Sequence, residues 1–188
     1  MARKYTAVTF TDSVKRAQEH YGARKTAAKV EAWDIDDERL SAEETDFLAE
    51  GDGFYMATVN EDGWPYVQHR GGPRGFLRVL NPTQLGYADF RGNTQLISVG
   101  NVSHDDRVSL ILMDYPNRRR LKILGHMRVQ DINDVTDKER ANVELGDYRA
   151  LVERVVLIDV VAFDWNCPQH ISKRYTADEW AATEEITT

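Results

Sequence analysis

Cysteine is nearly absent from this 188-residue chain, and long apolar runs and an excess of positive charge are missing. The single cysteine, Cys167, excludes an internal disulfide and fits a reducing compartment. No apolar run is long enough to span a bilayer, and the first residues lack an apolar signal region, so we expect a cytoplasmic protein outside the membrane. With 24 Lys and Arg against 31 Asp and Glu, the formal net charge is -7, which disfavours general binding of nucleic acid.

Several common chemical motifs are also missing. No Gly-Lys-Ser/Thr pattern follows a strand, so the chain has no P-loop. His20, His104 and His126 show no metal-ligand spacing with cysteine or carboxylates, and we predict no metal site. Cys167 has no activating base beside it in sequence, which argues against a nucleophilic thiol. Repeats, low-complexity tracts and linkers are absent, so residues 1–188 are expected to form a single domain.

What the chain does have is a series of short strands joined by turns. Phe54–Val59 and Trp64–Arg70 alternate around Asp62-Gly63, a strong hairpin signal. A second hairpin is expected from residues 76–79 and 85–90, and further strands at residues 107–115, 121–129 and 155–165. Antiparallel runs in this order predict a mainly β fold with peripheral helices, closed or nearly closed into a barrel.

Helices are expected between and around these strands. Thr11 or Asp12 begins a helix that runs to Tyr21, and Ser41 with Glu44 forms a capping box for a helix that ends at Gly51. Others are predicted at residues 94–102, 136–145 and 176–182, with a further turn at 148–154. Residues 1–10 are expected to be loosely held. We therefore treat residues 1–40 as an N-terminal helical extension and residues 176–188 as a C-terminal tail.

The sharpest candidate site is the run Gln68-His69-Arg70-Gly71-Gly72. Strand alternation sends Gln68 and Arg70 to one face and His69 to the other. Glycine backbone beside these donors can approach a ligand closely. The same residues also fit an edge strand with a solvated His and Arg, followed by a turn that needs glycine. Spacing alone leaves both interpretations open.

The second candidate is Asp89-Phe90-Arg91-Gly92-Asn93. This run is typical of a strand that ends in a turn whose Asn93 caps a helix, with Gln95 and Ser98 following on that helix. An ordinary strand-to-helix turn would look similar, but it does not account for Arg91. Free N–H groups at a helix start beside a guanidinium suit a phosphate group.

Two further segments carry polar groups. The basic run Arg118–Lys122 lies at a hairpin tip and is usually a solvated loop; it lacks the interleaved aromatics that nucleic-acid binding requires. The segment Phe163–Ile171 ends the last strand and combines Trp165 with two amides and a histidine beside Pro168. A turn that closes the barrel would explain this composition equally well.

Three separated stretches, YMATVNEDGWPYVQHRGGPRGFLRVL, YADFRGN and RRRLKILGHMRV, resemble in order the flavin-nucleotide-binding proteins related to pyridoxamine 5′-phosphate oxidase. The resemblance covers the chain from about Phe47 to about Tyr175. It implies a split β-barrel that pairs as a homodimer, with FMN held at the subunit interface.

The resemblance also implies roles for individual residues. Gln68, His69 and Arg70 would line the flavin ring, Arg120 or Lys122 would stand over its phosphate, and the segment after the last strand would reach the flavin of the partner subunit. The full set of candidate cofactor-binding residues is Gln68, His69, Arg70, Gly71, Gly72, Asp89, Phe90, Arg91, Gly92, Asn93, Gln95, Ser98, Lys122, Trp165, Asn166, Gln169 and His170.

The function implied by the resemblance is that of an FMN-dependent oxidoreductase acting on a small molecule, with an electron donor such as NAD(P)H. No catalytic residue is assigned, because the flavin would carry the redox chemistry. The alternatives are a flavin store or redox sensor without catalysis, or a pocket for haem or deazaflavin. Oxidation of pyridoxamine phosphate itself is disfavoured, because the chain departs from the true oxidase pattern at residues 68–72 and after Trp165.

Overall fold

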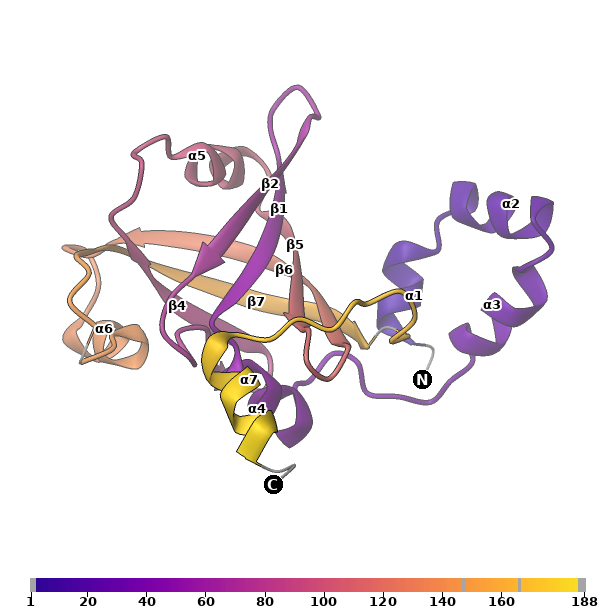
Figure 1. Ribbon diagram of the computed structural model, residues 1–188. Coiled ribbons are helices and arrows are strands. Elements are labelled where there is room, and N and C mark those ends of the chain that lie inside the picture. The colour runs from indigo at the N-terminus through magenta and orange to yellow at the C-terminus, as the bar shows by residue number, and fades with distance from the viewer. Residues whose placement is uncertain (1–2, 147, 166, 186–188) are drawn as a thin grey trace.

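The computed structural model describes residues 3–146, 148–165 and 167–185. Within these ranges the strands form one antiparallel sheet in the order β2-β1-β5-β6-β7-β4-β3 (Figure 1). The strands are β1 (Gly53–Val59), β2 (Pro65–Gly71), β3 (Arg78–Asn81), β4 (Gln84–Phe90), β5 (Arg107–Asp114), β6 (Arg119–Asp131) and β7 (Val152–Trp165). The predicted mainly β fold is confirmed.

The sheet rolls up on itself. Four strands separate β2 from β4 in the sheet order, yet Arg70 Nη1 on β2 lies 2.6 Å from Asp89 Oδ1 on β4. The ring of Phe54 on β1 likewise packs edge-on against Tyr87 on β4, with 5.6 Å between ring centroids. In the described part of the chain, β2 has ladder partners only on β1. Side chains therefore bridge the gap between the two edges, and no ladder of backbone hydrogen bonds does.

The core follows from alternation along the strands. Every second residue of β1, β5 and β6 is buried, including Phe54, Met56, Leu110 and Ile123. Burial of large apolar side chains on one face supplies the main stabilising free energy of such a sheet. Because these apolar groups fill the barrel, a polar site has room only at its open edges.

The helices surround the barrel (Figure 1). They are α1 (Lys4–Thr9), α2 (Asp12–His20), α3 (Arg24–Glu31), α4 (Ala42–Glu50), α5 (Ile97–His104), α6 (Asp137–Val143) and α7 (Ala177–Glu185). Helices α1–α3 group on one side and α6 lies on the opposite side. The caps predicted for α2 and α4 are confirmed, because Thr11 accepts a hydrogen bond from the Val14 N–H and Ser41 forms a capping box with Glu44. No helix in the described ranges has the length and apolar character needed to cross a membrane.

The prediction of a loose N-terminus is wrong. Arg3 is 7% exposed, and its guanidinium forms ion pairs with both Asp37 and Asp164. The Asp37 carboxylate also accepts hydrogen bonds from the backbone N–H groups of Lys4 and Tyr5. No local pattern predicts these pairs, because the partners lie 34 and 161 positions away from Arg3. Through Asp164 the pairs fix α1 to β7.

Two of the element boundaries that differ from the predictions lie close to the candidate runs. Strand β3 begins at Arg78 and not at residue 76, because Phe76 belongs to a turn in which its N–H donates to the Pro73 carbonyl. The helical turn predicted at residues 148–154 is wrong, since β7 already begins at Val152. This early start matters for the site, because it places Glu153 and Arg154 in the sheet.

Candidate functional site

Strand β2 presents two different faces. Gln68 and Arg70 pair in register with the buried Met56 and Phe54 and share their face of the sheet, so both are half-buried. His69 lies on the outer face, where its ring packs against Tyr55 with 5.3 Å between centroids. The alternation predicted for this run is therefore present. Gln68 and Arg70 face the gap in the barrel, and His69 does not.

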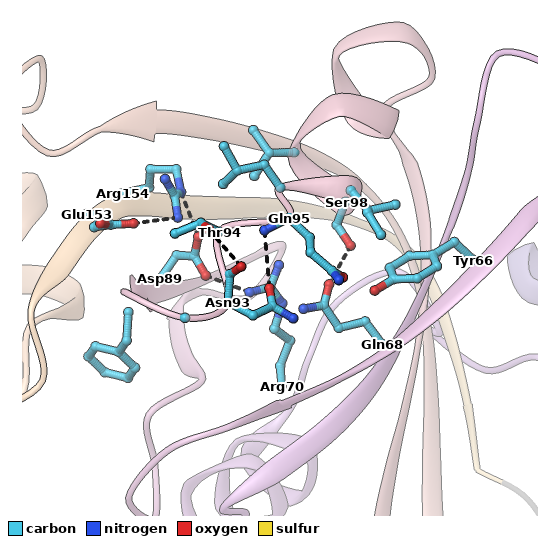
Figure 2. Close-up of a pocket in the computed structure, with 15 residues that line it drawn as sticks. Tyr66, Gln68, Arg70, Asp89, Asn93, Thr94, Gln95, Ser98, Glu153 and Arg154 are labelled. Atoms are coloured by element: carbon cyan, nitrogen blue, oxygen red, sulfur yellow. Dashed lines mark hydrogen bonds and ion pairs between the residues drawn. The ribbon is translucent and has the colours of Figure 1, made fainter.

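A cavity of about 210 Å³ lies at this gap, between β2, the residues before α5 and the start of β7 (Figure 2). We call it the first cavity. Its polar lining includes Tyr66, Gln68, Arg70, Asn93, Gln95, Ser98, Glu153 and Arg154. The lining therefore brings together residues of both candidate runs, which begin 21 positions apart in the sequence, at Gln68 and Asp89.

One wall of the first cavity is held by a hydrogen bond between β2 and α5. The hydroxyl of the buried Ser98 donates to Gln68 Oε1 at 2.8 Å (Figure 2). Because this bond fixes the amide group, it also determines which end of Gln68 stays available. Within the described residues the Gln68 amide nitrogen has no hydrogen-bond partner and can donate to a ligand.

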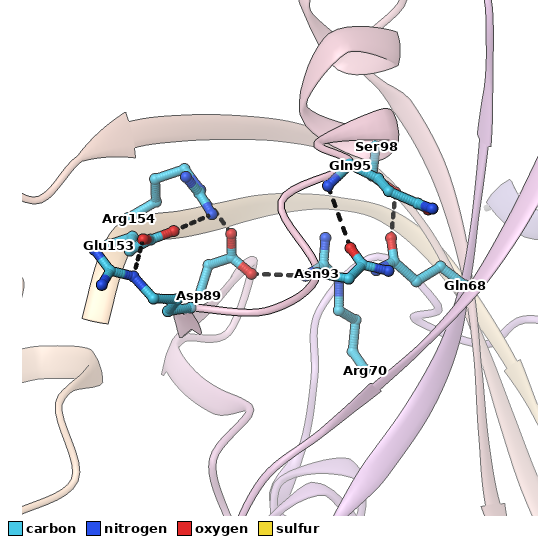
Figure 3. A network of polar contacts seen from close by, with 9 residues as sticks. Gln68, Arg70, Asp89, Asn93, Gln95, Ser98, Glu153 and Arg154 are labelled. Carbon is cyan, nitrogen blue, oxygen red and sulfur yellow. Dashed lines mark hydrogen bonds and ion pairs between the residues drawn. The ribbon is translucent and has the colours of Figure 1, made fainter. Parts of the chain in front are cut away.

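The opposite wall is a network of charges (Figure 3). Asp89, which is 4% exposed, accepts hydrogen bonds from Arg70 Nη1 at 2.6 Å and from Arg154 Nε at 2.7 Å. Glu153 accepts from Arg154 Nη2 at 3.0 Å and from Arg91 Nε at 2.7 Å. Three guanidinium groups thus share two carboxylates, and the network carries a net charge of +1.

The network shifts the pKa values of its members. Burial lowers the pKa of Arg154, but the hydrogen bond and charge of Asp89 outweigh it and leave that pKa raised. The hydrogen bond from Arg91 lowers the pKa of Glu153. Both shifts favour the charged forms, so Glu153 stays a carboxylate and Arg154 a guanidinium donor at neutral pH.

The segment between β4 and α5 departs from the prediction. Helix α5 begins at Ile97, and its N-cap Leu96 makes no side-chain hydrogen bond, so the prediction that Asn93 caps a helix is wrong. Asn93 Oδ1 instead accepts from the Gln95 N–H at 3.3 Å, in a local turn. Thr94 and Leu96 have φ values of 59° and 55°, in the left-handed region that such residues seldom adopt. Strained backbone of this kind concentrates at functional sites.

A second cavity, of about 300 Å³, is also lined by Arg70 and Asp89. Its lining further includes His69, Gly71, Phe76, Tyr87, Phe90, Arg91 and Tyr148. The structure thus separates two residues that the sequence grouped as a phosphate site. Arg91 lines the second cavity and Asn93 the first.

The remaining sequence candidates lie elsewhere in the chain. Lys122 pairs in register with Ile111 and Asp164 on the sheet and lines neither cavity. Trp165 Nε1 donates to Glu44 Oε1 at 2.7 Å, and its ring packs against Phe47 on α4. Gln169 and His170 are exposed after β7, and Asn166 lies outside the described residues. Within one chain, these residues do not complete either cavity.

Two glycines of the candidate runs have distinct surroundings. A Cβ on Gly71 would lie 2.9 Å from the His69 ring, so its absence leaves room for that ring on the outer face. A Cβ on Gly72 would lie 2.7 Å from the ring of Phe76, which indicates a packing role. Gly92 lines the first cavity and is exposed.

Sequence reasoning missed Tyr87, Glu153 and Arg154 as residues of the site. The signal for Arg154 is the sheet register, which places it opposite Asp89. That pairing becomes visible only once β7 is known to begin at Val152. No group of three metal-ligating side chains occurs among the residues that the structure describes.

The chain is similar in sequence to one protein family and in fold to several solved structures. The family model described as pyridoxamine 5′-phosphate oxidase matches residues 40–157, which is more than half of the chain. No curated protein sequence matches it. Among solved structures, HupZ of Group A Streptococcus is similar with a TM-score of 0.54 and 16% identity, covering 72% of this chain and 99% of that one.

Two other solved structures share the fold. A protein of Lactobacillus delbrueckii named for pyridoxamine 5′-phosphate oxidase has a TM-score of 0.52 and 21% identity, covering 69% of this chain and 97% of its own. An FMN-binding protein of Syntrophomonas wolfei has a TM-score of 0.51 and 10% identity, covering 83% and 96%. These likenesses establish the split-barrel architecture.

Proposed function

The chain belongs to the pyridoxamine 5′-phosphate oxidase family, and from this premise we propose that it binds FMN and acts as a flavin-dependent oxidoreductase on a small molecule. The observation that carries the proposal is the first cavity. There the free amide of Gln68 and the guanidinium of Arg70 face the strained segment that contains Asn93 and Gln95. A planar ring that carries carbonyl groups and a phosphate tail needs donors of this kind at both ends.

The residues present fit the two ends of FMN. We assign Gln68 and Arg70 to the pyrimidine edge of the ring, where donors stabilise the negative charge that develops on reduction. The side chains of Asn93 and Gln95 and the backbone N–H groups of residues 92–97, apart from the Gln95 N–H that donates to Asn93, are assigned to the phosphate, since phosphate binding depends on fixed donors. Ser98 is a positioning residue that orients Gln68. When bound, the flavin would supply the hydride or electron transfer.

One chain provides only part of such a site. The first cavity measures about 210 Å³, below the range of about 300–1,000 Å³ typical of ligand pockets. The outer face of the β1–β2 hairpin also exposes large apolar groups, with Val67 62% and Tyr55 41% accessible. We therefore propose a homodimer in which a second copy completes the flavin site. Trp165, Gln169 and His170 are the candidates that the second copy would contribute.

The test begins with the absorption spectrum of the purified protein, followed by titration with FMN. We expect a flavin spectrum. Replacing Gln68 with alanine should weaken FMN binding about 10-fold, the loss of roughly one hydrogen bond. Gln84→Ala is the matched control, because Gln84 is also a half-buried strand residue and bonds to Asp159 outside the cavity. Protein that stays colourless when mixed with FMN would refute the proposal.

A stopped-flow experiment then tests catalysis. Bleaching of the bound flavin by NAD(P)H, followed by reoxidation by an added acceptor, is the result expected of an oxidoreductase. Bound flavin that no donor reduces would mark the protein as a store or sensor. A haem or deazaflavin spectrum in place of a flavin spectrum would identify a different planar ligand.

A further inference from the structure

Two residues that line the second cavity each carry a buried polar atom with no hydrogen-bond partner among the described residues. Four buried side-chain nitrogen or oxygen atoms lack a hydrogen bond in the described part of the chain, and two of them, Arg70 Nε and Tyr87 Oη, belong to residues that line this cavity. Tyr87 is only 1% exposed. Folded proteins pair nearly all buried polar groups, so two unpaired donors beside one cavity require an explanation.

The charges around the cavity favour an anion. Asp89 already accepts hydrogen bonds from two guanidinium groups, and Glu153 does the same. Arg91, with a side chain that is 63% exposed, adds positive charge at the cavity mouth. Burial raises the pKa of Tyr87, so its hydroxyl keeps its proton at neutral pH and remains a donor. Unpaired donors beside a net positive network are the chemistry that binds carboxylate or phosphate.

The shape of the cavity limits the size of the ligand. Its volume of about 300 Å³ stands at the lower end of the range for small-molecule pockets. Phe76, Phe90 and Tyr148 supply aromatic walls, and the rings of Phe90 and Tyr148 meet edge-on with 4.9 Å between centroids. The cavity therefore combines oxyanion donors with apolar surface, which matches a small molecule that has both.

We propose that the second cavity binds small molecules carrying a carboxylate or phosphate on a compact apolar body, with Arg70 and Tyr87 donating to the oxyanion. Because Arg70 also lines the first cavity, such an anion is the substrate class placed next to the flavin. That role as substrate rests on the proposed function. Binding of the anion needs no flavin.

The test is calorimetric titration of the flavin-loaded protein with benzoate, phenyl phosphate and the neutral analogue benzamide. We expect at least one anion to bind about 10-fold or more tighter than benzamide, since a hydrogen bond to a charged group is worth about 1.5–3 kcal/mol. Whichever of benzoate and phenyl phosphate binds more tightly shows whether the cavity prefers a carboxylate or a phosphate. If neither anion binds, or if benzamide binds equally well, the inference is wrong.

Variants connect the binding to the named residues. Tyr87→Phe should weaken the anion about 10-fold, while Tyr115→Phe, in a separate groove, should leave the affinity unchanged. If Tyr87→Phe does not fold, Arg91→Gln replaces it, because Arg91 is mostly exposed and its loss should still lower the affinity severalfold. Unchanged affinity in the folded variant would overturn the proposal.

Two controls separate this inference from the flavin proposal. Anion affinity measured with and without saturating FMN should agree, and competition between FMN and the anion would show that the second cavity is part of the flavin site. Tyr87-dependent binding in a protein that never takes up flavin would uphold the anion site and refute the proposed function. Flavin binding without anion binding would uphold flavin binding and refute the anion site.

Discussion

A single carboxylate, that of Asp89, holds the two edges of the barrel together. It receives Arg70 from β2 and Arg154 from β7, and its side chain is 4% exposed. Within the described chain, Arg70 forms an ion pair with no carboxylate other than Asp89, and Arg154 pairs otherwise only with Glu153. Both cavities contact this residue, so its loss should affect stability and binding together.

Replacing Asp89 with asparagine should lower the free energy of unfolding by about 3–5 kcal/mol, because two partly buried guanidinium groups lose the charge of the carboxylate that they share. Urea denaturation measures this change. Glu144→Gln is the control: it removes an exposed pair with Arg140 on α6 and should cost less than about 1 kcal/mol. If Asp89→Asn and Glu144→Gln lowered the free energy of unfolding by the same small amount, Asp89 would not stabilise the contact between β2 and β4.

Helix α4 is linked to the end of β7 through Glu44. The carboxylate of Glu44 accepts hydrogen bonds from Ser41 N at 2.9 Å and Ser41 Oγ at 2.6 Å, which closes the capping box. It also accepts from Trp165 Nε1 at 2.7 Å. Burial raises the pKa of Glu44, but these hydrogen bonds outweigh burial and leave it below its ordinary value of 4.5. One side chain thus caps a helix and anchors it to the sheet.

This shift predicts a dependence of stability on pH. Because the pKa of Glu44 is lower in the folded state than its ordinary 4.5, its contribution is complete above that pH and is lost as the pH falls through the folded value. Glu44→Gln should therefore be less stable than the wild type at pH 7, and the difference should shrink between pH 5 and pH 3. Thermal melts across this range measure it.

The neighbouring Glu43 supplies the control for that experiment. Its side chain is 64% exposed and pairs with Arg119, so Glu43→Gln should change stability by less than about 1 kcal/mol. If the difference in stability between the wild type and Glu44→Gln stayed constant down to pH 3, the capping carboxylate would not be the group that titrates.

For the molecule as a whole, the central prediction is that two copies share the flavin. Val67→Arg places a charge on the exposed outer face of β2, where we propose that a second copy packs. Both the dimer and FMN binding should be lost, because burying an unpaired charge in an interface is strongly unfavourable. Analytical ultracentrifugation and FMN titration, run on the same samples, measure the two losses.

The matched control is Val8→Arg on α1, an equally simple change at a side chain that is 44% exposed and lies away from β2. It should leave both the dimer and the flavin site intact. A Val67→Arg monomer that still binds FMN with unchanged affinity would show that one chain suffices for the site.

The amino-acid sequence alone predicted much of the fold. Apolar patterning located the strands of the described chain, although it placed the start of β3 two residues early; Asp62-Gly63 located the first hairpin, and the capping box located α4. Gln68 and Arg70 were also placed correctly on one face. These features depend on neighbours within a few positions, where steric preference and local hydrogen bonding act.

Tertiary structure alone decided which distant residues meet. Asp89 finds Arg154 across 65 positions, and Arg3 finds Asp37 across 34. The separation of Arg91 from Asn93 and the unpaired hydroxyl of Tyr87 likewise follow from how the rolled sheet brings its edges together. Local patterns cannot specify such contacts, because they arise from the packing of the whole barrel around its apolar core.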